Sequence, residues 1–252
     1  MITGASRGLG AALAIEAADE DVHLSLTARQ IDALAHTKAA CENKGAKVDL
    51  YALDLTDAQS LPEFQGNLAD APDIFIANAG IFDGRSAADD LEDAQTIQDI
   101  LQTNLVGTLQ LCHAIAERMR TRGSGHIVTI SSLAGVAPLA DAPIYTASKA
   151  GLSAYSEAIA AYLEPFGILV TDARAGHIET EQTAVQNGGM PMMLSPQAAA
   201  KTIIHGIRKK RRVIQVPWTL AIGAHLSGFL PWRLRQWAMA SHRFYVDKKD
   251  KQ

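Results

Sequence analysis

The sequence predicts one α/β domain, a doubly wound parallel sheet with helices on both faces. Strand-like and helix-like segments alternate along the chain, and a glycine-rich turn joins the first of these strands to the first helix. The chain has 252 residues, 48% of them hydrophobic, which is enough for one large core. Strands that alternate with helices pair in parallel through right-handed crossovers, so we expect helices to cover the sheet on both sides.

Each strand is expected in a short apolar or alternating segment that is followed by a turn or a helix. The expected strands are 1–3, 22–28, 48–53, 74–77, 126–130, 168–173 and 213–216. The expected helices are one that begins near Leu9, then 31–43, 58–69, 97–120 and 145–163. A central strand usually has about five to six residues. We therefore expect the printed sequence to begin inside the first strand.

Composition excludes some classes of protein. The formal net charge of −4 gives no reason to expect a nucleic-acid partner. The two cysteines, Cys41 and Cys112, lie far apart and suit neither a disulfide framework nor a metal site, and no histidines have metal-ligand spacing. No secretory signal precedes the first motif. These observations predict a cytoplasmic protein without a bound metal.

The glycine-rich turn predicts a site for a dinucleotide. Its spacing is Thr-Gly-x-x-x-Gly-x-Gly, with glycines at Gly4, Gly8 and Gly10. Glycine lets backbone N–H groups approach a pyrophosphate, and the helix that follows adds a favourable dipole. Such a match alone can be an ordinary turn, but here it lies between a strand and a helix.

A second motif places a phenol beside an ammonium group. Tyr145 and Lys149 are four residues apart on an expected helix, so they lie on one face. Free tyrosine has a pKa of about 10, and a neighbouring ammonium group favours the phenolate. Tyrosine–lysine pairs also occur by chance on amphipathic helices. Ser132, at the end of an expected strand, lies thirteen residues before Tyr145 (145 − 132). Ordinary turn chemistry at a strand end is the alternative interpretation of Ser131 and Ser132.

These motifs together resemble the short-chain dehydrogenase/reductase family, in its short single-domain branch, over about residues 1–180. The resemblance implies a Rossmann-type fold and a catalytic set of Asn104, Ser132, Tyr145 and Lys149, in which spacing selects Ser132 rather than Ser131. Ser132 would polarise the substrate oxygen, Tyr145 would transfer the proton, and Lys149 would tune Tyr145 and hold the nicotinamide ribose. Asn104 would hold a water that links Lys149 to solvent, although it is also compatible with an ordinary surface asparagine.

The resemblance also implies the residues that hold the cofactor. Asp54 would bind the adenine amine, although a plain helix cap is the alternative, and Ile178 and Thr180 would hold the nicotinamide amide. Ala175 stands where the family usually has proline, so we expect a less rigid loop there. The full expected cofactor set is Gly4, Ser6, Arg7, Gly8, Leu9, Gly10, Arg29, Asp54, Leu55, Asn78, Ala79, Gly80, Tyr145, Lys149, Ile178 and Thr180.

Charge at the end of the second strand predicts which dinucleotide binds. A carboxylate there would accept hydrogen bonds from the ribose 2′-OH, but the chain has Leu26-Thr27-Ala28-Arg29. Arg29 and Arg7 are suited to pair with a 2′-phosphate. The sequence therefore favours NADP(H), with NAD(H) as the second possibility and a solvated Arg29 as the alternative interpretation.

The resulting prediction is an NADP(H)-dependent oxidoreductase that interconverts a ketone or aldehyde and an alcohol. A dinucleotide-binding regulator without turnover is the alternative, and the complete catalytic set argues against it. A lid is expected over 181–196, where Met190, Met192 and Met193 indicate an apolar small-molecule substrate or a loop packed on its own core. A homodimer or homotetramer is expected.

The C-terminal segment departs from the family pattern. We expect the domain to span 1–216 and an amphipathic extension, packed on or beside it, to span 217–252. A basic run at 208–212 precedes Trp218, Trp232 and Trp237. The extension either lies on a membrane surface or covers the substrate cleft or a subunit interface. The sequence alone favours the second interpretation.

Overall fold

Seven parallel strands form the central sheet of the structure, a computed structural model that describes residues 1–86, 90–184, 186–190, 192–238, 240 and 243–246. The order across the sheet is β3-β2-β1-β4-β5-β6-β8, and each neighbouring pair is parallel. The strands are β1 (Ile2–Thr3), β2 (His23–Ala28), β3 (Lys47–Ala52), β4 (Ile74–Ala77), β5 (Gly125–Ser132), β6 (Ile168–Ala175) and β8 (Val213–Val216). The order reverses between β1 and β4, which opens a crevice at the carboxyl ends of the strands.

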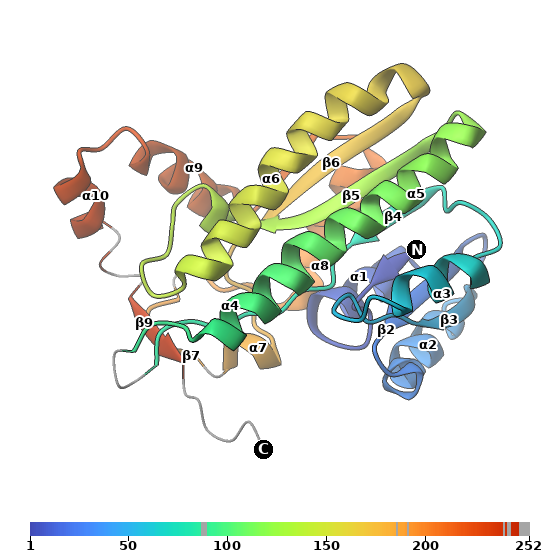
Figure 1. The fold of residues 1–252 in the computed structure, drawn as a ribbon, viewed down its shortest axis with the longest axis horizontal. Coiled ribbons are helices and arrows are strands. Elements are labelled where there is room, and N and C mark those ends of the chain that lie inside the picture. Colours follow the sequence, from blue (N-terminus) through green and yellow to red (C-terminus); the bar gives the residue numbers. More distant parts are fainter. Residues whose placement is uncertain (87–89, 185, 191, 239, 241–242, 247–252) are drawn as a thin grey trace.

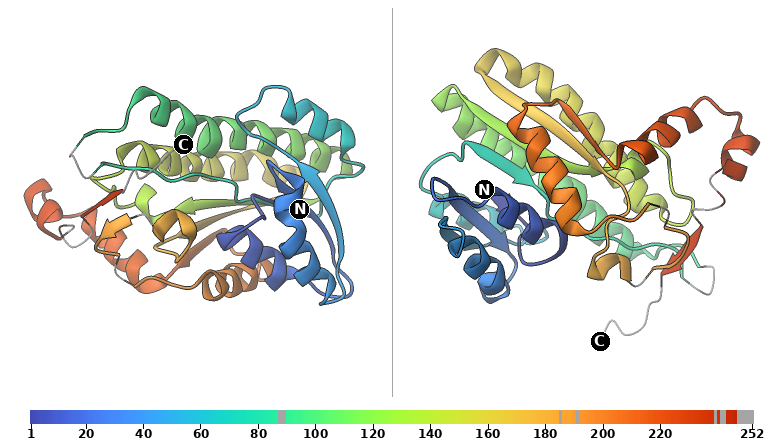
Figure 2. Two further views of the ribbon diagram at one scale, coloured as in Figure 1. Left: turned by 90° about the horizontal axis from the view of Figure 1, so that it is seen from below. Right: turned by 180° about the vertical axis from the view of Figure 1, so that it is seen from behind.

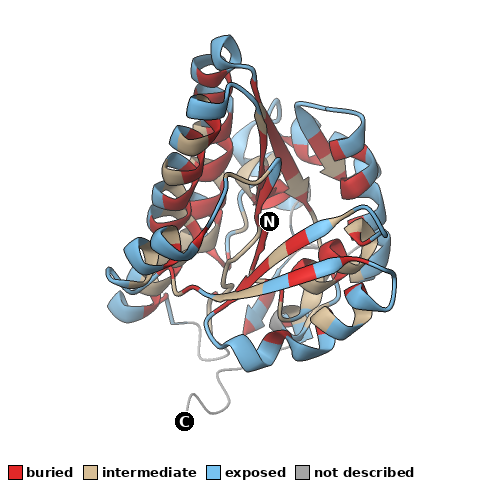
Figure 3. Cartoon of the chain, turned by 90° about the vertical axis from the view of Figure 1, so that its right-hand side faces the viewer, coloured by how far each residue is buried: buried red, intermediate tan, exposed pale blue. Residues whose placement is uncertain are grey.

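Helices cover both faces of this sheet (Figure 1). One apolar cluster joins the sheet to α1 (Gly8–Ala17), α2 (Ala35–Glu42) and α8 (Pro196–Arg208). The other joins it to α3 (Ser60–Asn67), α5 (Thr108–Arg122) and α6 (Pro143–Leu163). The strands are largely buried between helices whose outer faces are exposed (Figure 3). The predicted doubly wound Rossmann-type fold is therefore confirmed.

The helix expected over 97–120 is interrupted. The structure has α4 (Ala94–Leu101), a π-helical segment (Gln102–Gly107) and then α5. The π-helical segment contains Asn104, whose buried amide bonds both backbone groups of Ile81. Single π-helical turns inside α-helices are frequent at functional sites. Apolar periodicity does not reveal such a turn, because it changes the hydrogen-bond pattern without ending the helix.

The C-terminal segment has two parts. After β8, α9 (Trp218–Ser227) and α10 (Trp232–Ala238) project from the edge of the domain (Figures 1 and 2). The chain then returns as β9 (Phe244–Val246), which pairs antiparallel with β7 (Gln186–Gly188) of the expected lid. Pro191 of that lid, and residues 239, 241–242 and 247–252 of the extension, lie outside the described residues. None of the helices in the described ranges has the length and hydropathy needed to cross a membrane.

A buried histidine on β5 makes the fold sensitive to acid. His126 Nε2 lies 2.7 Å from Thr171 Oγ1, whose own hydrogen goes to the Arg211 carbonyl at 2.6 Å. A hydroxyl has one hydrogen, so His126 Nε2 is the donor in this bond. Burial lowers the pKa of His126 from 6.5 to about 4, and the Lys210 charge adds to this effect.

We expect the protein to lose stability as the pH falls from 6.5 to 4. In that window the unfolded chain binds the His126 proton and the folded chain does not, so the free energy of unfolding falls, on the order of 2 kcal/mol from this group. Urea unfolding across the window measures this loss. His126→Gln should flatten the dependence, whereas His36→Gln, at an exposed position, should leave it unchanged. An unaltered pH dependence in His126→Gln would contradict the assignment.

Candidate active site

A single pocket at the carboxyl edge of the sheet is lined by every residue of the expected cofactor set. The glycine-rich turn forms one wall. Gly4 has a φ of 64°, a conformation that favours glycine. A Cβ at Gly10 would overlap the Gly4 carbonyl oxygen and lie 2.5 Å from Asn78 Nδ2. Glycine at position 10 therefore lets the turn pack directly against the end of β4.

Thr3 begins the glycine-rich motif, but the motif gave its side chain no role. Its Oγ1 accepts hydrogen bonds from the backbone N–H groups of Asn78 and Ala79, each at 3.0 Å. Asn78 Nδ2 in turn donates to the Thr3 carbonyl at 2.9 Å. These bonds fasten the end of β4 to the turn after β1, at the point where the strand order reverses. Asn78 therefore stabilises the contact between these two segments.

The two arginines expected at a 2′-phosphate have different surroundings. Arg29 lies exposed on the pocket lining at the end of β2. Arg7 forms an ion pair with Glu181, with Nη1 and Oε2 2.5 Å apart. Glu181 is the first residue of α7 (Glu181–Ala184), so the pair joins the turn to the lid. Arg7 is therefore engaged by a carboxylate of the lid, whereas Arg29 lies exposed on the pocket lining.

Asp54 is not the helix cap that we weighed as its alternative role, because the N-cap of α3 is Gln59. Its Oδ1 accepts from Thr56 N at 2.9 Å and from Thr56 Oγ1 at 2.7 Å. These bonds close a turn, because α3 begins only at Ser60. Asp54 also lines the pocket, where this turn holds its carboxylate.

Tyr145 lies at the other end of the pocket, in the first turn of α6. Its ring packs edge-to-face on Phe82, with centroids 4.8 Å apart. Burial raises the pKa of Tyr145 above 10.0, and a hydrogen bond with Ser132 opposes that rise. This direction is opposite to the lowering that we expected from Lys149. The Lys149 Nζ lies 5.8 Å from the centre of the Tyr145 ring. This distance is at the outer limit of a cation–π contact.

Ser132 connects Tyr145 to the end of β6. Its hydroxyl lies 3.0 Å from the Ala175 carbonyl oxygen and accepts a hydrogen bond from Ala134 N at 3.1 Å. A serine hydroxyl has one hydrogen, so it donates either to Ala175 or to Tyr145. Donation to the phenolate becomes favourable when Tyr145 has lost its proton. Ser132 is therefore placed to respond to a proton transfer at Tyr145.

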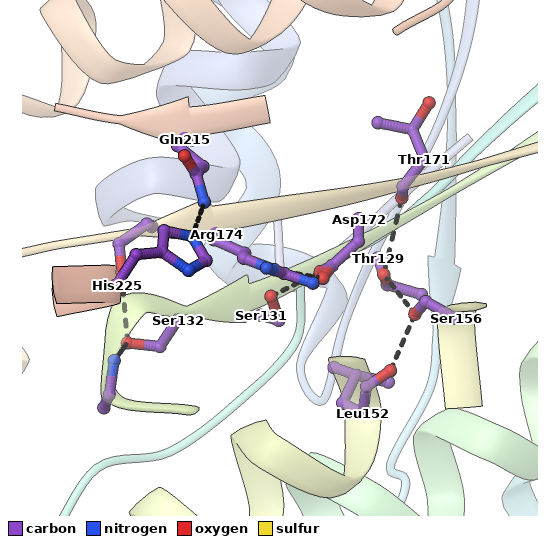
Figure 4. Close-up of polar contacts among 12 residues, drawn as sticks. Thr129, Ser131, Ser132, Leu152, Ser156, Thr171, Asp172, Arg174, Gln215 and His225 are labelled. Atoms are coloured by element: carbon purple, nitrogen blue, oxygen red, sulfur yellow. Dashed lines mark hydrogen bonds and ion pairs between the residues drawn. The ribbon is translucent and has the colours of Figure 1, made fainter. Parts of the chain in front are cut away.

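Lys149 is buried beside a polar cluster between α6 and the sheet. Its Nζ donates to the Ile130 carbonyl at 2.9 Å. Burial lowers the pKa of Lys149 to about 8, and the Asp172 carboxylate opposes this. Asp172 accepts a hydrogen bond from the Ser131 hydroxyl and pairs with Arg174 Nε at 2.7 Å (Figure 4). The cluster keeps a negative charge near Lys149.

Motif matching did not identify Ser131, Asp172 or Arg174 as parts of the site. The sequence did contain one signal, the polar residues Asp172 and Arg174 at alternating positions of an expected buried strand. Side chains at alternating positions of a strand lie on one face. Asn104 joins the same region: its Nδ2 donates to the Ile81 carbonyl at 2.8 Å and to Ser148 Oγ at 3.3 Å. A Cβ at Gly80 would lie 3.2 Å from Asn104 Oδ1 and 3.5 Å from Lys149 Nζ, which places these two groups close together.

The loop after β6 is held by a threonine that we had not singled out. Thr183 Oγ1 donates to the Ile178 carbonyl and accepts from Thr180 N, each at 2.8 Å. Thr180 packs over the glycine-rich turn, where a Cβ at Gly8 would lie 3.2 Å from its methyl group. The loop is thus fixed by hydrogen bonds despite alanine at position 175.

An apolar wall of packed residues lies behind Tyr145. It consists of Phe82, Leu139, Ala142, Phe244 and Val246, of which Phe82 also lies on the pocket lining. Asp141 is buried next to this wall and binds Arg85 Nε at 2.9 Å, Arg243 Nε at 2.8 Å and Phe244 N at 3.1 Å. The returning strand β9 is therefore attached to the mouth of the pocket.

A doubly wound sheet with a glycine-rich turn and a tyrosine–lysine pair in one pocket defines a class of dinucleotide-dependent oxidoreductase. The family model described as short chain dehydrogenase matches residues 1–190. The chain belongs to this family and is an NAD(P)-dependent dehydrogenase or reductase.

Relatives and solved structures agree with this assignment. An uncharacterized oxidoreductase of Myxococcus xanthus (strain DK1622) is 32% identical over 234 residues, 92% of each chain. A short-chain dehydrogenase from Sphingobium yanoikuyae in complex with NADPH is 27% identical with a TM-score of 0.77, covering 92% of this chain and 95% of that one. The bulky-bulky ketone specific alcohol dehydrogenase from Comamonas testosteroni is 26% identical with a TM-score of 0.75, covering 92% and 94%.

Proposed function

We propose that the protein is an NADP(H)-dependent oxidoreductase that interconverts an apolar ketone or aldehyde and the corresponding alcohol. The observation that carries this proposal is one pocket that is lined by the glycine-rich turn and by both Tyr145 and Lys149. The Ser132 hydroxyl lies near Tyr145, where it opposes the rise in the Tyr145 pKa. Arg29 lies on the lining of the same pocket.

The pocket suits a dinucleotide. The left-handed conformation of Gly4 and the close packing of Gly10 against the Gly4 carbonyl shape a turn at the start of α1, whose backbone N–H groups suit a pyrophosphate. Arg29 would hold the 2′-phosphate, Asp54 the adenine, and Thr180 and Ile178 the nicotinamide amide. When bound, the reduced cofactor supplies a hydride for a carbonyl carbon.

The protein's own groups handle the oxygen and the proton. Ser132 donates a hydrogen bond to the carbonyl oxygen and positions it. Tyr145 gives its proton to that oxygen as negative charge develops, which a positioned acid accelerates. The positive charge of Lys149 stabilises the resulting phenolate. Asn104, close to Lys149, connects it to a path for proton return, and the same groups act in reverse on an alcohol.

The apolar wall behind Tyr145 supports the proposal of an apolar substrate, because its Phe82 lies on the pocket lining. Phe82 and Phe244 pack with ring centroids 5.8 Å apart next to Tyr145. The solved alcohol dehydrogenase from Comamonas testosteroni, which is specific for bulky-bulky ketones, has a similar fold. A homodimer or homotetramer and a cytoplasmic location stay predictions.

Turnover with NADPH tests the proposed function. Purified protein should consume NADPH in the presence of some apolar ketones or aldehydes of graded size, and should oxidise the matching alcohols with NADP. A regulator that only binds dinucleotide would bind NADPH and give no consumption with any compound. That second outcome would favour the alternative function.

Arg29→Asp should reverse the preference between cofactors. A charge-assisted hydrogen bond contributes about 1.5–3 kcal/mol, so NADPH binding should weaken by roughly 10- to 100-fold while NADH binding changes little. Fluorescence titration with each cofactor measures the two dissociation constants. Lys47→Asp, at an exposed position at the start of β3, should change neither. Equal losses for both cofactors in Arg29→Asp would contradict the role given to Arg29.

A further inference from the structure

The segment 218–237, here called the C-terminal arm, exposes its large apolar side chains. The fully buried residues of α9 are the small ones Ala221, Ala224 and Ser227. The outer side carries Trp218 and Leu226, which are 68% and 60% exposed. This is the reverse of an ordinary surface helix, which turns its large apolar side chains toward the core. The apolar face of α9 is therefore directed away from the domain.

The rest of the arm continues this face. Phe229, between the two helices, is 87% exposed, and Trp232 and Trp237 of α10 are 73% and 79% exposed. The chain has three tryptophans, and all of them lie in the arm. Tryptophan is enriched where proteins meet the interface between a bilayer and water. The arm also extends beyond the body of the domain in all views (Figures 1 and 2).

Charge distinguishes this part of the chain from the remainder. Residues 182–246 contain nine Lys or Arg residues and no Asp or Glu. The whole chain has a formal charge of −4, so the other residues together carry −13 (−4 − 9). The arm itself contributes Arg233 and Arg235. The basic run 208–212 lies before β8, at the other end of that strand, and its Arg212 pairs with Glu164, so it is not part of the arm.

We propose that the C-terminal arm docks on the surface of an anionic phospholipid bilayer. The acyl boundary would receive Trp218, Phe229 and Trp232, and the headgroup phosphates would pair with Arg233 and Arg235. A second copy of the chain fits less well. A two-fold dimer through the arm places the arm of one copy against the arm of the other, which offers these arginines no carboxylate to pair with.

The position of the arm relates docking to the pocket. A Cβ at Gly176 would lie 3.0 Å from Leu220 Cδ2, so α9 packs against the loop after β6. Thr219 Oγ1 lies 3.3 Å from Met192 Sδ in the lid segment. A bilayer under the arm would lie beside the mouth of the pocket. Docking does not depend on turnover and is measured without cofactor or substrate.

Cosedimentation of the full chain with vesicles tests the proposal. Protein should pellet with vesicles of phosphatidylcholine and phosphatidylglycerol, more weakly with phosphatidylcholine alone, and less as salt rises. The double variant Phe229→Ser, Trp232→Ser should bind about tenfold more weakly or worse, because it removes two inserted apolar side chains. Leu91→Ser, at a side chain that is 76% exposed on another part of the surface, should bind as the parent does.

Two charge-reversal variants separate the contribution of the lipid headgroups from that of the inserted apolar side chains. Arg233→Glu should weaken binding to anionic vesicles about tenfold and leave the weaker binding to phosphatidylcholine nearly unchanged. Lys47→Glu, which makes the same charge change at the far edge of the sheet, should have no effect. Circular dichroism of each variant verifies that the fold is retained.

Two results would overturn the proposal. One is a parent protein that pellets with neither kind of vesicle. The other is an arm variant that binds vesicles normally but dissociates an oligomer in light scattering, which would make the arm an interface between copies. Neither result bears on NADPH turnover with soluble ketones, so a failure here is distinct from a failure of the proposed function.

Discussion

Tyr145→Phe should lower kcat by about 10²- to 10⁴-fold, the usual contribution of a positioned acid or base. The variant keeps the ring that packs on Phe82 and removes only the hydroxyl that bonds Ser132. Cofactor affinity should therefore change little. Steady-state NADPH consumption measures the first effect, and titration with NADPH measures the second.

Tyr155→Phe is the matched control on the same helix. The Tyr155 hydroxyl is buried without a hydrogen-bond partner among the described residues. Removing an unsatisfied buried hydroxyl should leave activity unchanged and stability equal or higher. Full turnover in Tyr145→Phe, or equal losses in the two variants, would show that Tyr145 does not transfer the proton.

Gly10→Ala should abolish most cofactor binding. The new methyl group would overlap the Gly4 carbonyl oxygen and lie 2.5 Å from Asn78 Nδ2, so the turn and the end of β4 must separate. Overpacking of this kind costs about 1–3 kcal/mol. We expect NADPH affinity to fall at least about tenfold because the backbone N–H groups move, and the melting temperature to fall as well.

Gly66→Ala supplies the comparison for this substitution. Gly66 lies inside α3, and a Cβ there meets nothing within 4 Å. Alanine in a helix interior is favoured over glycine by about 0.5–1 kcal/mol. Gly66→Ala should therefore raise the melting temperature and leave NADPH affinity unchanged. If Gly10→Ala binds NADPH as the parent does, the glycine-rich turn does not hold the pyrophosphate.

Local patterns predicted the sheet well. The ranges 74–77 and 213–216 coincide with β4 and β8, because short apolar segments bounded by turns and basic residues have few other interpretations. The first part of the expected helix 31–43 is instead a 3-10 turn at Ile31–Leu34. The ends of a helix depend on local contacts that the apolar periodicity of a sequence does not reveal.

The expected cofactor residues came from a motif, and the structure gathers them around one pocket. The motif did not predict that Arg7 pairs with Glu181 or that Asp172 lies near Lys149. These contacts join residues 174 and 23 positions apart in the sequence, so no local pattern records them. The hydrogen bonds from Asn78 and Ala79 to Thr3 also join distant parts of the sequence, so the motif did not predict them.

The C-terminal segment was the hardest to predict. The sequence left open a membrane surface and a cover for the cleft or an interface, and favoured the second. In the single chain α9 and α10 leave the tryptophans exposed, while β9 packs beside Tyr145. Composition gives amphipathic character but not the direction of the apolar face. That direction depends on the small residues Ala221 and Ala224, which set the inner side of α9.

Transfer of label from the cofactor tests the central claim most directly. NADPH that carries deuterium at its hydride position would be incubated with the protein and an apolar ketone, and the alcohol analysed by mass spectrometry. Our account predicts deuterium on the carbinol carbon with the parent and with Tyr155→Phe, and almost none with Tyr145→Phe in the same time. Protein that binds NADPH but transfers no deuterium to any carbonyl compound, or that transfers it equally without the Tyr145 hydroxyl, would contradict it.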